Sequence, residues 1–161
     1  SASLVGSEMC IRDREKDYKT SAISTDPINH EKMVRARQQK IDGIATDIPL
    51  LKVSGDSSAD LLVVGWGGTY GHLYSAVEAM NAEGKPVAFA HFNYINPLPA
   101  NTEEILRRYK KVVVCELNNG QFASYLSGKV PGVNFLRYNK IQAQPFMVSE
   151  LMAHFSKLLE E

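Results

Sequence analysis

The feature that most constrains the fold is a repeated alternation of short apolar runs and amphipathic segments after Asp60. The apolar runs predict four buried strands, at 61–64, 87–92, 111–116 and 133–137. Helices are expected between them, because apolar residues recur there at spacings of three and four. Strands that are apolar throughout, each followed by a helix, are typical of a parallel sheet covered on both faces. The sequence therefore predicts an α/β fold.

The clearest helix follows the first strand. Apolar residues form one helical stripe along 73–80, and Gly84 is expected to end it. Asn101 and Glu104 have the spacing of a capping box and predict the start of the next helix. The remaining helices are expected at 101–109, at 120–129 and from Ser149 to the end of the chain.

The first 59 residues lack this alternation. Residues 1–14 have no periodicity and resemble a translated sequencing adaptor, so we expect a non-native tail there. Residues 15–59 are interpreted as a linker with a helix at 28–45 and a possible edge strand at 51–53. Residues 60–161 then form the predicted domain.

The helix at 28–45 has a basic face. Asp26 and Pro27 predict its start, because aspartate caps free amides and proline suits a first turn. The basic residues are Lys32, Arg35, Arg37 and Lys40. Such a face can bind phosphates, but a solvated or interface face is the commoner outcome, and we expect that outcome here.

Charge and cysteine content exclude several classes of protein. Lysine plus arginine number 18, as do aspartate plus glutamate, so the chain lacks the excess basic charge of a nucleic-acid or anionic-membrane binder. No apolar run approaches the roughly 18 residues that cross a bilayer. Cys10 and Cys115 are the only cysteines, and Cys115 is expected to be a buried thiol. Two cysteines give no disulfide framework, which favours the cytoplasm.

Candidate sites lie in the loops after the strands, because ligands and partners of an open α/β sheet meet the carboxyl ends of its strands. Four loops have that place, at Trp66–Gly71, 93–99, 117–121 and 138–144. Chain order does not fix which are neighbours. If the first and third strands pair, the glycine turn at 65–71 and the stretch ELNNGQ at 116–121 face each other.

The glycine turn GWGGTYG, at 65–71, allows two interpretations. One is a phosphate cradle, because the glycines lie between a strand and a helix. Against a dinucleotide site, no carboxylate ends the second strand, and Trp66 and Tyr70 would crowd a pyrophosphate. The other interpretation is a close approach of two backbones.

Polar candidates follow the third and fourth strands. Glu116 suits acid–base chemistry or an interface hydrogen bond, of which we favour the second. The loop after the fourth strand can hold a carboxylate or phosphate, or satisfy a neighbouring subunit. Its polar residues are Asn139, Lys140, Gln142 and Gln144. The four histidines are scattered without ligand spacing, so no metal site is expected.

Five stretches, taken in order, carry a family resemblance: DPINHEKMVRARQQKI (26–41), GWGGTYG (65–71), HFNYINPLP (91–99), ELNNGQ (116–121) and YNKIQAQPF (138–146). Together they resemble the C-terminal part of the alpha subunit of 2-oxoglutarate:ferredoxin oxidoreductase, a 2-oxoacid:ferredoxin oxidoreductase. The resemblance implies a transketolase C-terminal-like domain of three α/β/α layers. Its five-stranded, mostly parallel sheet has the order 1-3-2-4-5, with the first strand antiparallel.

The resemblance also implies a function. The whole enzyme decarboxylates 2-oxoglutarate on thiamine diphosphate, reduces ferredoxin through an iron–sulfur cluster and forms succinyl-CoA. In the family, the residues for the diphosphate, magnesium and the cluster lie mainly in the beta subunit. We therefore expect no cofactor in this chain and no activity from it alone. The implied partners are the beta subunit and, through the complex, ferredoxin and coenzyme A.

Under this interpretation the turn and the polar loops form an interface, with Trp66 and Tyr70 as aromatic anchors. The residues expected to face a partner or ligand are Trp66, Gly67, Gly68, Thr69, Tyr70, Gly71, Glu116, Asn118, Asn119, Gln121, Tyr138, Asn139, Lys140 and Gln142. Two alternatives remain open. One is a nucleotide-binding module with a Rossmann-like turn, and the other is the C-terminal domain of another thiamine diphosphate enzyme.

Overall fold

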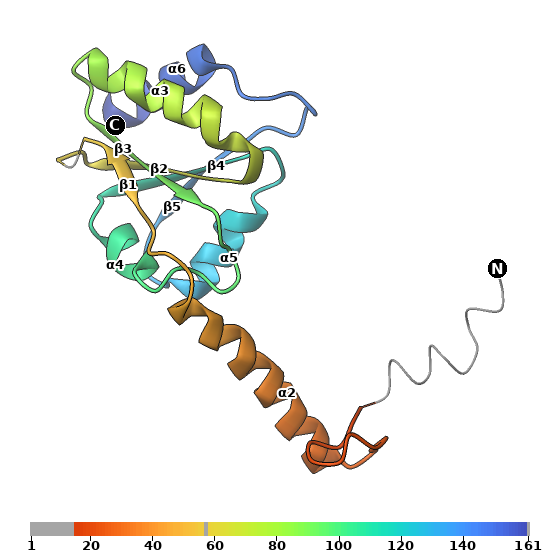
Figure 1. Cartoon of the computed structure of the whole chain (residues 1–161). Helices are drawn as coiled ribbons and strands as arrows, with labels where there is room; N and C mark the ends of the chain where they lie inside the picture. Colours follow the sequence, from red (N-terminus) through yellow and green to blue (C-terminus); the bar gives the residue numbers. More distant parts are fainter. Residues whose placement is uncertain (1–14, 57, 161) are drawn as a thin grey trace. The chain divides into compact units, whose positions relative to one another are not determined.

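The chain divides into two units, Ser1–Asp47 and Ile48–Glu161. The computed structural model describes residues 15–56 and 58–160 (Figure 1). The tail expected at 1–14 lies outside the described residues. Each unit is considered separately below.

The N-terminal unit is built around one helix. Helix α2 spans Pro27–Gly43 and continues into a 3₁₀ turn, η2, at Ile44–Thr46. The Asp26 side chain accepts hydrogen bonds from the backbone N–H groups of Ile28 and Asn29, which confirms the predicted start.

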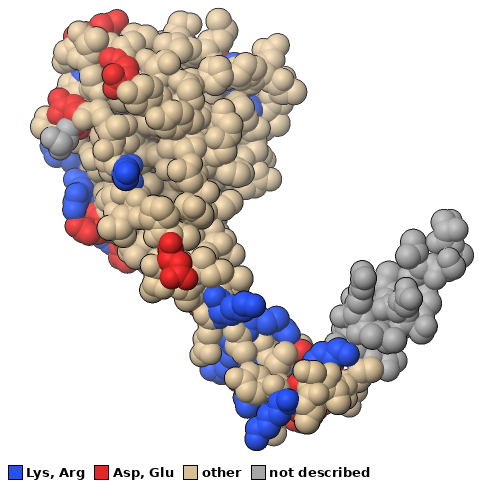
Figure 2. Space-filling view, viewed as in Figure 1, with Lys and Arg blue, Asp and Glu red and all other residues tan. Residues whose placement is uncertain are grey.

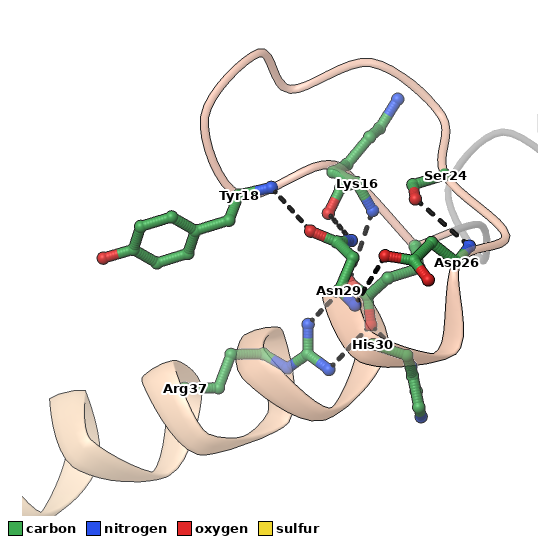
Figure 3. A network of polar contacts seen from close by, with 8 residues as sticks. Lys16, Tyr18, Ser24, Asp26, Asn29, His30 and Arg37 are labelled. Atoms are coloured by element: carbon green, nitrogen blue, oxygen red, sulfur yellow. Dashed lines mark hydrogen bonds and ion pairs between the residues drawn. The ribbon is translucent and has the colours of Figure 1, made fainter.

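A polar network fastens the segment before α2 to the helix (Figure 3). Glu15 pairs with His30 over 2.8 Å and with Arg37 over 3.0 Å. The Asn29 side chain accepts from the Tyr18 N–H and donates to the Lys16 carbonyl. Much of the basic face is therefore engaged within the unit. Arg35 pairs with Glu31, and Lys32 lies 3.9 Å from the centre of the Tyr18 ring.

The C-terminal unit contains a five-stranded sheet of order β1-β3-β2-β4-β5. The strands are β1 (Val53–Gly55), β2 (Leu61–Trp66), β3 (Val87–Phe92), β4 (Lys111–Glu116) and β5 (Phe135–Asn139). β1 pairs antiparallel with β3, and the other pairings are parallel. The expected order and the antiparallel first strand are confirmed.

Helices cover both faces of this sheet (Figure 1). α3 (Tyr70–Ala82), which follows the 3₁₀ turn η3 (Gly67–Thr69), lies with α6 (Val148–Glu160) on one face. α4 (Thr102–Arg107) and α5 (Gln121–Lys129) lie on the other. A hydrophobic core lies on each face of the sheet, and successive strand residues point alternately into one core and the other. Val63 and Phe89 lie in the core beneath α3, while Val64 and Ala90 lie in the core beneath α4.

Four local predictions need correction. The edge strand begins at Val53, two residues later than its expected start, and β5 likewise begins at Phe135. β2 continues through Gly65 and Trp66, which were assigned to the turn. The capping box at Asn101 is wrong, because that side chain instead bonds the backbone N–H and carbonyl of Leu51. The long-range pair uses both ends of the amide, whereas a cap would use only its oxygen.

Candidate functional site

The loops that follow β2, β3, β4 and β5 meet at one side of the sheet, which we call the carboxyl edge. β2 pairs with both β3 and β4, so the glycine turn lies beside the loops at 93–99 and 117–120. The conditional expectation that the glycine turn faces the loop after β4 is confirmed by a direct side-chain contact described below.

Gly65 brings α3 close to β2. A Cβ at this residue would lie 2.4 Å from Leu73 Cδ1 and 2.9 Å from Thr69 Oγ1, so only glycine fits. Thr69 closes the turn, because its hydroxyl donates to the Trp66 carbonyl and accepts from the Trp66 N–H. The expected close approach of helix and strand is confirmed at Gly65.

The close approach of α3 to β2 does not explain the other glycines of the turn. Gly67 has a φ of +58°, in the left-handed region that favours glycine. A Cβ at Gly68 or Gly71 would have no neighbour within 4 Å among the described residues. Nothing among residues 15–56 and 58–160 therefore requires glycine at Gly68 or Gly71, and close approach of another subunit stays a prediction for them.

Glu116 is fully buried at the end of β4. Its carboxylate accepts hydrogen bonds from the indole N–H of Trp66 and from the backbone N–H groups of Phe122 and Ala123, at 3.3, 2.8 and 2.9 Å. The two backbone groups lie in the first turn of α5, where the helix dipole favours a negative charge. Glu116 thus holds α5 and β2 together. Its carboxylate is thus engaged within the chain, and the expected hydrogen bond across an interface stays a prediction.

The loop after β4 is shaped by its own side chains. Asn118 Oδ1 accepts from the N–H groups of Gly120 and Gln121. Gly120 has a φ of +86°, and a Cβ there would lie 2.9 Å from Asn139 Nδ2. Asn119 and Gln121 are exposed, so of the expected residues in this loop they are the ones available to a partner.

The loop after β5 is organised around Lys140. Its ammonium donates to the Pro145 carbonyl and to Glu150, and its side chain is only 12% exposed. The hydrogen bond from Lys140 lowers the pKa of Glu150 below its usual value. Lys140 is therefore engaged within the chain, and its expected role toward a ligand or a neighbouring subunit stays a prediction. Tyr138 stacks on Phe146 and on His154, while Asn139, Gln142 and Gln144 are exposed.

A small apolar cavity lies beside Trp66. It has a volume of about 220 Å³ and is lined by Trp66, Ile95, Asn96, Gln121, Phe122 and Tyr125. None of these side chains is charged. The cavity is also smaller than the roughly 300 Å³ at which pockets for drug-sized ligands begin, and a dinucleotide is larger than such a ligand. The cavity thus offers a dinucleotide neither room nor a cation for its pyrophosphate.

A larger cavity, of about 710 Å³, opens between the start of α3 and the β1 edge. Its polar lining includes Lys52, Ser54, Tyr70, His91 and Asn93. The sequence did not predict this cavity. Lys52 precedes β1 and Ser54 lies in it, and the pairing register of this short edge strand could not be derived from the sequence. Only Tyr70 was among the expected residues.

The carboxyl edge also carries exposed apolar side chains. Within the described part of 48–160, the large apolar residues with exposed side chains are Leu50, Tyr70, Tyr74, Tyr94, Ile95, Leu117, Ile141 and Met147. They lie in the loops after β3, β4 and β5, in the first turns of α3, or just before β1, which starts at the same edge. Figure 2 shows Lys and Arg along α2, whereas much of the visible face of the C-terminal unit carries no charge. Sequence reasoning identified only Tyr70 of this set.

Two further searches covered the described residues alone. No group of three or more histidine, cysteine, aspartate or glutamate side chains that could hold a metal ion occurs among them. No helix within 15–56 or 58–160 is long and apolar enough to span a bilayer. Cys115 is a buried free thiol, as expected.

No family model matches the chain, but individual proteins of known function are similar to it in sequence. The chain is 45% identical over 130 residues to the 2-oxoglutarate oxidoreductase subunit KorA of Mycobacterium tuberculosis, covering 80% of this chain and 19% of that protein. It is 30% identical over 137 residues to the alpha subunit of 2-oxoacid:ferredoxin oxidoreductase 1 of Aeropyrum pernix, covering 81% of this chain and 21% of that protein.

Solved structures agree. The 2-oxoglutarate:ferredoxin oxidoreductase of Magnetococcus marinus superimposes with a TM-score of 0.82 at 25% identity, over 89% of this chain and 26% of that one. A split-gene transketolase with a TM-score of 0.50 and 13% identity, over 68% of this chain and 41% of that one, supports the fold alone. The chain spans about a fifth of the length of the curated relatives it matches. It belongs, as one domain, to the alpha subunits of the 2-oxoacid:ferredoxin oxidoreductases.

Proposed function

We propose that this chain is a non-catalytic interface domain of the alpha subunit in an enzyme that oxidatively decarboxylates 2-oxoglutarate, forms succinyl-CoA and reduces ferredoxin. The relative with 45% identity is named for 2-oxoglutarate, and the superimposed Magnetococcus enzyme has 2-oxoglutarate, coenzyme A and succinyl-CoA bound. These names support the choice of substrate. The implied place of work is the cytoplasm.

The observation that carries the proposal is the exposed apolar edge. An edge on which the start of α3 and the loops after β3, β4 and β5 each contribute an exposed apolar residue is typical of a protein–protein interface, since monomers rarely expose such a set together. Tyr70 and Tyr74 stack with ring centres 5.6 Å apart and form a rigid aromatic pair there. The proposed occupant is the rest of the oxidoreductase, with the beta subunit as the principal partner.

The reactive groups at this edge do not fit the cofactors of the complex. Magnesium and a diphosphate need free carboxylates and amides, but Glu116 already accepts three hydrogen bonds and Glu150 is paired with Lys140. An iron–sulfur cluster needs thiolates, yet burial raises the pKa of Cys115 far above its usual value and keeps the thiol neutral. We therefore assign thiamine diphosphate, magnesium and the cluster to other parts of the complex.

Activity is tested with the natural full-length alpha subunit that contains this chain, co-expressed with its beta subunit. We expect a viologen dye to be reduced only when 2-oxoglutarate and coenzyme A are both present. Turnover with another 2-oxo acid alone would correct the substrate, and no turnover with any 2-oxo acid would reject the assignment.

The interface is tested in the same complex with the double substitution Leu117→Ser and Ile141→Ser. Both side chains are exposed, so the change should cost the fold little and instead weaken alpha–beta assembly. The matched control is Lys110→Ser, an exposed residue that precedes β4 at the opposite end of the strand. A double variant that co-elutes with the beta subunit as tightly as the control would refute the interface.

A further inference from the structure

The cavity beside β1 gathers polar side chains through strand register. β1 pairs antiparallel with β3, with Ser54 opposite Phe89 and Val53 opposite Ala90. One residue further in the same register places Lys52 opposite His91. Opposed residues of an antiparallel pair point to the same face, so Lys52 and His91 lie side by side on the α3 face of the sheet.

Tyr70 forms the other wall of this cavity. Its ring meets the His91 ring edge to face, with centres 5.1 Å apart, and also lies 5.8 Å from the Phe89 ring. Half of the Tyr70 side chain remains exposed. The cavity is therefore a groove between an aromatic wall and a polar strand edge.

The groove is rich in hydrogen-bond donors, and none of its described lining residues carries a carboxylate. Its lining provides the Lys52 ammonium, the Ser54 and Tyr70 hydroxyls and the Asn93 amide. Neither an ion pair nor a hydrogen bond engages the Lys52 side chain within residues 15–56 and 58–160. A free cation among neutral donors favours an anionic ligand.

His91 adds a directed donor. Its Nδ1 atom is buried and has no hydrogen-bond partner among the described residues. Burial lowers the pKa of His91, which favours the neutral ring. A neutral ring carries one N–H, and Nε2, unlike Nδ1, is not among the buried unpartnered atoms of the described residues, so we assign Nε2 as the nitrogen that donates to a ligand in the groove.

A second, smaller cavity shares part of the same lining. It has a volume of about 250 Å³, and it is bounded by Lys52, His91 and Asn93 together with Pro49, Leu50, Leu51, Tyr94 and Pro99. Its additional residues are predominantly apolar. The polar groove is thus adjacent to an apolar cavity that can accommodate the short hydrocarbon tail of a ligand.

We propose that this groove binds a small molecule with an anionic head group, a carboxylate or a phosphate ester, joined to an apolar tail. Lys52 neutralises the head group, while His91 Nε2 and the Asn93 amide donate to its oxygens. The tail lies in the smaller cavity against Leu50 and Pro99. Tyr70, Leu50 and Tyr94 also belong to the proposed interface, so the binding is tested in this chain without the other subunits.

The test is an NMR titration of the 161-residue chain, with nitrogen detection of the histidine rings. The probes are hexanoate, hexyl phosphate and, as a neutral match, hexanol, all at constant ionic strength. We expect one or both anions to shift the His91 ring signals saturably at millimolar concentration. Binding of only one anion would identify the head group. No saturable shift, or equal binding of hexanol, would overturn the proposal.

Variants separate specific binding from charge alone. Lys52→Gln alters an exposed side chain and should weaken anion binding about tenfold, since it removes a charge-assisted hydrogen bond. Lys40→Gln removes an equally exposed lysine from α2 and should leave the affinity unchanged. His91→Phe keeps the ring against Tyr70 but loses the donor, and should also weaken binding. Equal effects of Lys52→Gln and Lys40→Gln would contradict a site at the groove.

Discussion

Trp66 donates its indole N–H to the carboxylate of Glu116 over 3.3 Å and so joins the ends of the neighbouring strands β2 and β4. The same carboxylate accepts from the backbone of Phe122 and Ala123 at the start of α5. One buried acidic group therefore sets the geometry of a strand pair and a helix. This buried contact fixes the relative positions of β2, β4 and α5 at the carboxyl edge.

Glu116→Gln should lower the free energy of unfolding by about 2 kcal/mol, because an amide nitrogen would face one of the buried N–H donors. Urea denaturation of the 161-residue chain measures the change. Glu103→Gln is the control, since Glu103 forms an exposed ion pair with Arg107 and should cost less than about 0.5 kcal/mol. Equal midpoints for the two variants would show that Glu116 does not hold the edge together.

Gly65→Ala should destabilise the chain by roughly 1–3 kcal/mol through overpacking. The added methyl would overlap Leu73 Cδ1, and Leu73 is fully buried and cannot move freely. Gly68→Ala is the matched change in the same turn, at a residue with open space, and should be close to neutral. Thermal unfolding of both variants compares them. A Gly65→Ala variant as stable as Gly68→Ala would mean that α3 can move away from β2 at little cost.

The strands and their helices could be predicted because continuous apolar runs leave few alternatives to buried parallel strands. Val63 and Val113, for example, belong to such runs and lie in the core of the sheet. The strand order was implied by the family resemblance rather than by any local pattern. Register was the weak point. β1 has only three residues, and its pairing with β3, which brings Lys52 into the same cavity lining as His91, could not be derived from the sequence.

The roles of Glu116 and Asn101 could not be predicted for a different reason. Each side chain bonds backbone groups that are distant in the chain or exposed only at a helix start, and backbone groups leave no signature in the sequence. The contact of Lys140 with Glu150 was not predicted either, because Glu150 lies in the next helix. The exposed Leu117 and Ile141 left a usable signal, which was an apolar residue within an otherwise polar loop.

Gly71→Val separates folding from assembly. No described atom would lie within 4 Å of a Cβ at Gly71, so the isolated chain should keep its stability within about 0.5 kcal/mol, whereas assembly with the beta subunit should fail. Gly67→Val cannot make this distinction, because the positive φ of Gly67 already strains any side chain. Urea denaturation and size-exclusion chromatography of the co-expressed subunits provide the two measurements. A folded Gly71→Val subunit that still forms the normal complex would remove Gly71 from the interface.

Lowering the pH should break the Glu15 contacts of the N-terminal unit over a defined pH range. The hydrogen bond from Arg37, followed by that from His30, lowers the pKa of Glu15 from 4.5 to about 2. A carboxyl group with a lowered pKa stabilises the folded state above its ordinary pKa, and this contribution is lost as the pH falls from 4.5 towards 2. NMR titration of the Glu15 side-chain carboxyl measures this pKa directly. Arg37→Gln should move the pKa of Glu15 back towards 4.5, whereas Arg35→Gln, which removes a cation paired with Glu31, should leave it low. A wild-type Glu15 that already titrates near 4.5 would show that the segment before α2 is not held by these contacts.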